Sequence, residues 1–221
     1  MPLMKGNLSS AEKGRSDITP EWDVRQLNHE KPEEEETSST TVYLEPLGRQ
    51  MAVGSFEEVA RFTSVDKGYW NIVSIHGPQE REARLPFART IHYACFDDIE
   101  EEDSALGRSP RAEDIAAIFG FIRSLDCITP LPPLMIHCQQ GISRSAAVAL
   151  AWVYGHLPAT GDRPMRAIDL TLELRPQAKP NRLVLALGLA QFLPLGEARN
   201  LAERIVCEPR LMRNRFQSNI G

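Results

Sequence analysis

Residues 133–157 constrain this chain more than any other segment, because they place two buried elements next to each other. The run Pro133-Leu134-Met135-Ile136-His137 has the length and composition of a short buried strand. Residues 143–157 follow as a helical stretch that is apolar on nearly every side. Such elements have to be covered by others, so this strand and this helix belong inside a layered domain.

The rest of the chain alternates between the same two kinds of element. Three further runs predict strands: 41–44, 70–75 and 90–96. Four further stretches predict helices, the first with Ser55 as its N-cap: 55–62, 110–125, 163–174 and 181–193. Strands that alternate with helices favour an α/β fold with a central, mostly parallel sheet flanked by helices.

The composition predicts one folded domain with a charged arm. Of 221 residues, 42% are hydrophobic and 25% are charged, as in ordinary globular proteins. Residues 1–40 hold five basic and nine acidic residues, so they carry −4 of the net charge of −5. We expect residues 1–40 to be a disordered acidic tail, 41–195 the folded domain, and 196–221 a C-terminal helical extension.

Several classes of function are disfavoured. The negative net charge gives no footprint for nucleic acid, and no apolar run has the length of about 18 residues that a membrane span needs. The first residues lack the apolar core of a signal peptide. The cysteines at 95, 127, 138 and 207 have no paired spacing, and no histidines and carboxylates cluster at ligand spacing. We therefore expect a reduced, cytoplasmic protein without a metal or cofactor.

The loop between the buried strand and its helix carries the chemistry. Ligands of open α/β sheets bind beyond the carboxyl ends of strands, and amides at a helix N-terminus attract anions. Gly141 permits the turn, and Arg144 can bind two anion oxygens in a fork. The same positive field favours the thiolate of Cys138. These features predict phosphoryl transfer to cysteine, with an anion cradle formed by residues Gln139, Gln140, Gly141, Ile142, Ser143 and Arg144.

A second Cys-x5-Arg pattern runs from Cys207 to Arg213. It contains no glycine and follows no strand, and Glu208 stands where an anion would have to bind. We interpret this copy as a coincidence within a C-terminal helix.

The segment His137-Cys138-x-x-Gly141-x-Ser143-Arg144-Ser145 resembles the signature loop of cysteine-dependent protein tyrosine phosphatases. Its Gly-Ile-Ser-Arg-Ser form is most similar to the dual-specificity branch and its small bacterial relatives. Phe96-Asp97-Asp98-Ile99 lies where that group carries its general acid, and Arg175-Pro176-x-Ala178-x-Pro180-Asn181 resembles the stretch before its last core helix. The resemblance covers residues 68–193 and implies that 41–195 is a phosphatase domain.

The resemblance also implies a mechanism. Cys138 would attack phosphorus, and Arg144 with the loop amides would hold the phosphoryl oxygens. Ser145 would hydrogen-bond the sulfur, and His137 would order the loop and favour the thiolate. Asp98 is the preferred general acid, and Asp97 remains the alternative.

The expected substrates are phosphorylated proteins or small phosphomonoesters, with phosphotyrosine first and phosphoserine or phosphothreonine next. Two other functions remain open: a lipid or nucleotide phosphate phosphatase, and an inactive phosphopeptide-binding module. The neutral side chains of Gln139, Gln140 and Ile142 count against highly charged phosphoinositides. The presence of a nucleophile, an arginine and an acid counts against an inactive module.

Three smaller expectations concern residues around the loop. Cys95 is expected to be an inert thiol, with a redox disulfide to Cys138 as the alternative. Asn181 either positions a loop near the site or caps the following helix. The acidic run Glu100-Glu101-Glu102-Asp103 is expected to be a solvated loop.

Overall fold

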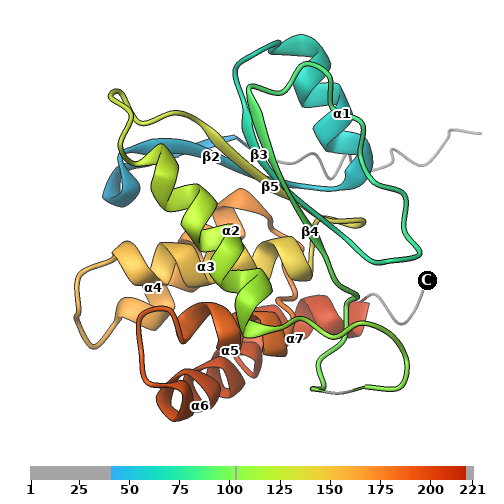
Figure 1. Cartoon of the computed structure of the whole chain (residues 1–221). Helices are drawn as coiled ribbons and strands as arrows, with labels where there is room; N and C mark the ends of the chain where they lie inside the picture. Colours follow the sequence, from blue (N-terminus) through green and yellow to red (C-terminus); the bar gives the residue numbers. More distant parts are fainter. Residues whose placement is uncertain (1–40, 103, 218–221) are drawn as a thin grey trace, which may run out of the picture. The chain divides into compact units, whose positions relative to one another are not determined.

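The computed structural model describes residues 41–102 and 104–217. The predicted acidic tail, residues 1–40, lies outside the described residues. Five strands form one sheet in the order β1-β2-β5-β3-β4 (Figure 1). Their bounds are Val42–Leu44 (β1), Arg49–Gly54 (β2), Asn71–His76 (β3), Thr90–Cys95 (β4) and Leu134–His137 (β5).

Strand β5 lies at the centre of the sheet, and it is the buried strand that the apolar run at 133–137 predicts. It pairs in parallel with β2 on one side and with β3 on the other, and β3 pairs in parallel with β4. Only β1 is antiparallel, at the edge beside β2. All four residues of β5 are buried. The prediction of an α/β fold with a central, mostly parallel sheet is confirmed.

Helices cover both faces of this sheet, as Figure 1 shows. Helix α1 lies on one face, and the other helices lie on the opposite face. After the short 3-10 helix η2 (Glu45–Leu47), the helices are α1 (Phe56–Val65), α2 (Ala112–Leu125), α3 (Arg144–His156), α4 (Arg163–Leu174), α5 (Arg182–Leu189), α6 (Leu195–Val206) and α7 (Pro209–Gln217).

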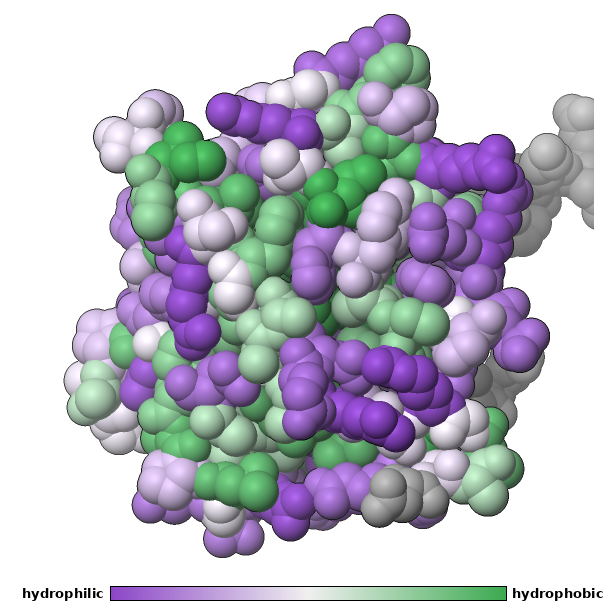
Figure 2. All heavy atoms as spheres, in the orientation of Figure 1, coloured by the Kyte–Doolittle hydropathy of each residue, from purple (hydrophilic) through white to green (hydrophobic). Residues whose placement is uncertain are grey.

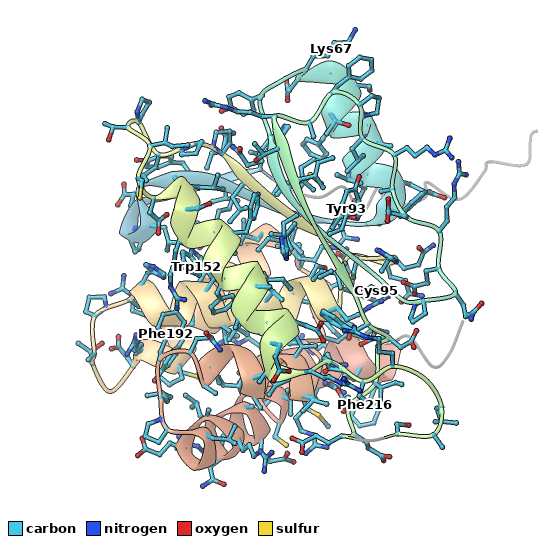
Figure 3. The ribbon with its side chains drawn as sticks, viewed as in Figure 1. Lys67, Tyr93, Cys95, Trp152, Phe192 and Phe216 are labelled. Carbon is cyan, nitrogen blue, oxygen red and sulfur yellow. The ribbon has the colours of Figure 1, made fainter. Side chains whose placement is uncertain are left out.

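Each face of the sheet has its own hydrophobic core. Beneath α1, a smaller cluster surrounds Trp70. The ring of Trp70 meets that of Phe62 edge-on, with 5.9 Å between the ring centroids. On the other face, α3 is surrounded by apolar neighbours. The ring of its Trp152, labelled in Figure 3, meets that of Phe119 edge-on, with 5.3 Å between the ring centroids. The expected burial of the helix after the central strand is therefore confirmed.

Strand β2 is the element that the sequence did not reveal. Its apolar part is only Met51-Ala52-Val53, and it begins with the charged Arg49. That arginine is 1% exposed, and its Nη2 lies 2.5 Å from Asp126 Oδ1. This ion pair compensates for the cost of burying the charge of Arg49. Because its partner Asp126 lies far along the chain, no local sequence pattern predicts the burial.

The C-terminal residues form two helices that complete the main core. Buried side chains come from both α6 and α7: Ala198, Leu201, Ala202, Ile205, Val206 and Leu211. Cys207 ends α6 and Arg213 lies on α7, and both are exposed. The second Cys-x5-Arg pattern therefore spans a junction between helices, not a loop after a strand.

The described surface shows no membrane-spanning element. Among the described residues, no helix is both long and apolar enough to cross a bilayer. Figure 2 shows hydrophilic and hydrophobic side chains mixed over one face of the molecule.

The contact between α3 and α5 gives a prediction about stability. A Cβ at Gly188 on α5 would lie 2.6 Å from Ala151 Cβ on α3, whereas a Cβ at Gly120 on α2 would meet nothing within 4 Å. We expect Gly188→Ala to lower the free energy of unfolding by about 1–3 kcal/mol through overpacking. Gly120→Ala should raise it by about 0.5–1 kcal/mol through helix propensity. Urea unfolding measures both, and equal effects of the two changes would contradict the packing argument.

Candidate active site

Cys138 follows β5 directly, at the carboxyl end of the central strand. The side chain is buried, and its sulfur has two close polar neighbours. The backbone N–H of Gly141 donates to Sγ at 3.3 Å, and Ser145 Oγ lies 3.2 Å from Sγ. The predicted contact between Ser145 and the sulfur is therefore present in the geometry.

The loop after Cys138 is held by its carbonyl groups from outside. Four of these groups accept hydrogen bonds from neighbouring segments: Gln139 O from Phe56 N (3.2 Å), Gln140 O from Arg175 Nη2 (3.3 Å), Ile142 O from Lys179 N (2.8 Å) and Ser143 O from Asn181 N (3.4 Å). The donors belong to the start of α1 on one side and to residues 175–181 on the other.

This arrangement orients the amides of the loop. In a planar trans peptide, the N–H of one residue points opposite to the carbonyl of the residue before it. Because the carbonyl of Gln140 points outward to Arg175, the N–H of Gly141 points inward to the sulfur. The same reasoning turns the N–H groups of Ser143 and Arg144 away from the outer segments. The geometry is compatible with the predicted anion cradle, which stays a prediction.

Gly141 is the residue on which this close packing depends. Its φ of 73° lies in the left-handed region that glycine adopts readily. A Cβ at this position would lie 2.3 Å from the carbonyl carbon of Gly54. The junction between β2 and α1 therefore approaches the loop so closely that only glycine fits.

A buried ion pair supports the loop from behind. Arg175 Nη1 lies 2.8 Å from Oε1 and 3.0 Å from Oε2 of Glu58, while its Nη2 holds the Gln140 carbonyl. Glu58 also accepts the N–H of Ser55 at 2.6 Å, in the capping box of α1. The sequence analysis missed Glu58, although its place three residues after Ser55 marks a capping box.

Arg144 is the first residue of α3, and it is 3% exposed. Its Nη1 donates to the Phe96 carbonyl at 2.9 Å, and its Nη2 donates to Glu80 Oε1 at 2.8 Å. Its Nε is buried and has no hydrogen-bond partner among the described residues. An unpaired buried N–H next to the cradle is a donor that an incoming anion can use.

Glu80 lies in the loop after β3 and was not anticipated from the sequence. Its Oε2 accepts the N–H of Gly77 at 2.6 Å, which fixes the carboxylate beside Arg144. Burial acts to raise the pKa of Glu80, but hydrogen bonds from Arg144 and Gly77 outweigh it and lower the pKa. Burial likewise acts to lower the pKa of Arg144, and the bond to Glu80 with the charges of Cys138, Glu80 and Asp98 raises it.

The two candidate acids have different surroundings. Asp97 closes the base of its own loop: its Oδ2 accepts the Arg108 N–H at 2.8 Å, and its N–H donates to the Arg108 carbonyl at 2.8 Å. Asp98 is exposed and faces the cradle segment, because Ser143 Oγ donates to its Oδ1 at 2.8 Å. Its Oδ2 accepts no hydrogen bond from the described residues.

Asn181 performs both of the roles considered for it. Its Oδ1 caps α5 by accepting the N–H of Val184 at 2.9 Å. Its Nδ2 donates to Asp98 Oδ1 at 2.8 Å and to the Ile99 carbonyl at 3.2 Å. The amide is fully buried, so one rigid residue joins the start of α5 to the acid loop.

The expectation of a solvated loop after Asp98 is wrong for Glu100, whereas Glu101 and Glu102 are exposed. Glu100 Oε1 accepts the N–H of Arg182 at 3.1 Å and lies 3.0 Å from Arg215 Nη2. Glu102 pairs with Arg199 at 2.5 Å. The run is tied to helices α5, α6 and α7, whereas Asp103 lies outside the described residues.

His137 is 2% exposed, and neither of its ring nitrogens has a hydrogen-bond partner among the described residues. Burial first, and then the nearby His76 and Arg144, lower its pKa from 6.5 to about 4. The imidazole is therefore neutral at pH 7. Both roles expected of His137, ordering the loop and favouring the thiolate, stay predictions.

Cys95 lies at the end of β4, where Figure 3 labels it. Strand β3 separates β4 from β5, so Cys95 and Cys138 are two strand spacings apart, about 9–10 Å. A disulfide needs Cα atoms within about 7 Å. The geometry therefore favours an inert thiol at Cys95.

Among the described residues, no group of three or more histidine, cysteine, aspartate or glutamate side chains is placed to hold a metal ion. The site is built instead from a thiol, backbone amides, an arginine and a carboxylate.

Solved structures with a similar fold were found, although no protein-family model matches the sequence and no curated protein is significantly similar to it. A mouse protein described as a dual specificity phosphatase, in complex with zinc tungstate, is 16% identical; the match covers 89% of this chain and 99% of that chain, with a TM-score of 0.51. A variant of human DUSP28 is 16% identical over 74% of this chain and 97% of that chain, with a TM-score of 0.50. The predicted fold is therefore confirmed: the chain has the fold of the dual-specificity phosphatases.

The buried His137 gives a prediction about pH. The unfolded chain binds a proton at this residue near pH 6.5, and the folded chain only near pH 4. Unfolding therefore takes up a proton between these values, and stability is lost as the pH falls from 6.5 towards 4. Relative to His137→Asn, the wild-type protein should lose about 2 kcal/mol of unfolding free energy between pH 7 and pH 5. Urea titrations of both proteins measure this difference, and parallel pH profiles would contradict it.

Proposed function

We propose that this chain hydrolyses phosphomonoesters through a cysteinyl-phosphate intermediate. Phosphotyrosine is the preferred substrate, and phosphoserine and phosphothreonine are further substrates. The observation that carries this proposal is the position of Cys138 in a loop whose carbonyls are held outward, beside an arginine with an unpaired buried N–H. The dual-specificity phosphatase fold supports it, although a fold alone does not determine a reaction.

In the first step, the sulfur of Cys138 forms a bond to phosphorus as the bond from phosphorus to the leaving oxygen breaks. The loop amides and Arg144 stabilise the charge on the equatorial oxygens. Asp98 donates its proton to the leaving oxygen, and its Oδ2, which accepts no hydrogen bond from the described residues, is the oxygen that carries it.

In the second step, water attacks phosphorus and gives its proton back to Asp98. The bond between sulfur and phosphorus breaks, and Cys138 leaves as a thiolate. Ser145 Oγ, 3.2 Å from the sulfur, donates the hydrogen bond that assists this departure.

Three further assignments belong to this proposal: the substrate class, the cellular location and the catalytic domain. The neutral side chains of Gln139 and Gln140 are exposed and add no positive charge for phosphoinositides. Four free cysteines support a reducing, cytoplasmic location. We also assign catalysis to residues 41–195.

The first test is hydrolysis of p-nitrophenyl phosphate under reducing conditions, between about pH 5 and 8. We expect activity that survives EDTA and is lost in Cys138→Ser, because a serine hydroxyl is a far weaker nucleophile than a thiolate at this pH. Rapid acid quenching followed by mass spectrometry should find a phosphoryl group on Cys138 in the wild-type protein. If the intact protein binds phosphopeptide but does not hydrolyse it, the proposed enzymatic function is wrong and the chain is a phosphopeptide-binding module.

The two aspartates should separate in a second test. Asp98→Asn should lower kcat for phenyl phosphate by about 10²–10³-fold, because the leaving oxygen loses its proton donor. Asp97→Asn should retain kcat within a few-fold and lower stability by about 1 kcal/mol, because its side chain only closes the loop. Circular dichroism checks that both variants fold. Equal kcat values would remove the assignment of Asp98.

A further inference from the structure

Helix α7 carries one side chain that touches both segments next to Asp98. Arg215 Nη2 donates to Glu100 Oε1 at 3.0 Å and to the carbonyl of Pro180 at 2.6 Å. Glu100 lies two residues after Asp98 in the chain, and Pro180 immediately precedes Asn181, whose amide holds Asp98. Arg215 therefore bridges the acid loop and the segment that holds the acid.

The residue before it strengthens this contact. Asn214 Nδ2 donates to the carbonyls of Pro176 at 2.8 Å and Ala178 at 2.9 Å. Residues 176–181 in turn hold the cradle, through Lys179 N to the Ile142 carbonyl. Figure 1 shows α7 close to the end of β4, where the acid loop begins. Helix α7 thus contacts the one segment that holds both the acid and the cradle.

We propose that Arg215 is a positioning residue for Asp98, so that the C-terminal helix α7 takes part in placing the general acid. This inference rests on the proposed phosphatase function. Asp98 is exposed and lies on a loop, and a general acid acts only when it is within hydrogen-bond reach of the leaving oxygen. An arginine suits this task because its planar guanidinium keeps its donors in fixed directions.

The contribution of Arg215 is geometric rather than electrostatic. Its side chain is 29% exposed and that of Glu100 is 36% exposed, so solvent and salt weaken the attraction between their charges. Arg182 also binds Glu100, through its backbone N–H, but this contact comes from α5. Arg215 adds the restraint from α7.

The test compares two substrates whose leaving groups differ in their need for a proton. Phenolate is a poor leaving group and requires the acid, whereas p-nitrophenolate leaves more easily and requires it less. Arg215→Gln should lower kcat/KM for phenyl phosphate by about tenfold and for p-nitrophenyl phosphate by less than about twofold, because kcat/KM reports the steps through departure of the leaving group and excludes hydrolysis of the shared intermediate. Arg215→Lys should recover part of the loss, because it keeps the charge and one donor.

Arg210→Gln is the matched control. Arg210 also lies on α7, and it pairs with Asp169 on α4 at 2.5 Å, away from the acid loop. Arg210→Gln should leave both kcat/KM values unchanged. If Arg215→Gln lowers the unfolding midpoint more than this control does, Glu100→Ala removes the acceptor of the same contact from the loop side and should give the same selective loss.

The outcomes separate this inference from the proposed function. An equal loss of kcat/KM on both substrates, no loss, or a loss shared by Arg210→Gln overturns the positioning role. If the wild-type protein hydrolyses neither substrate, the proposed function fails, and hydrogen exchange decides the structural part. Faster exchange of amides 97–102 in Arg215→Gln, with amides 138–145 unchanged, then supports the restraint by α7, and unchanged exchange overturns it.

Discussion

The site depends on the direction of the peptide groups between Cys138 and Arg144. Outer segments hold the carbonyls of this loop, so its amides face inward, and the amide of Gly141 meets the sulfur. A loop of this length contains too few residues to hold itself in that conformation against its own entropy. The conformation is maintained by α1 and by residues 175–181, which lie far from the loop in the chain.

Two buried arginines around the loop are each paired with a carboxylate. Arg144 and Arg175 are almost inaccessible, and each is paired with a carboxylate, Glu80 or Glu58. A buried charge without a partner lowers the stability of the fold by several kcal/mol. The carboxylate partners are therefore what allows guanidinium groups to be buried around the loop. Arg144 Nε has no hydrogen-bond partner among the described residues, so this donor supports the anion-binding role that we propose for Arg144.

Local patterns predicted most of the fold and the centre of the site. Apolar runs located four of the five strands, and the boundaries of the helices differ by a few residues. Strand β2 escaped because its burial of Arg49 depends on Asp126, 77 residues away. Glu80 and Arg215 escaped for the same reason: exposed-looking charges in loops and on a terminal helix acquire partners only when the chain folds. Glu100 was likewise misjudged, because the backbone N–H of Arg182 and the guanidinium of Arg215 bind its carboxylate.

The sequence alone determined most of the elements and the chemistry of the loop: a buried strand, a cysteine loop with Gly141, and a buried helix that follows it. These properties follow from hydrophobic periodicity and residue type, which are local. The tertiary structure decided which groups meet. It placed Asp98 rather than Asp97 against Ser143 and Asn181, and it brought α7 to the acid loop. Hydrogen bonds depend on distance and direction in space, and separation along the chain does not encode either.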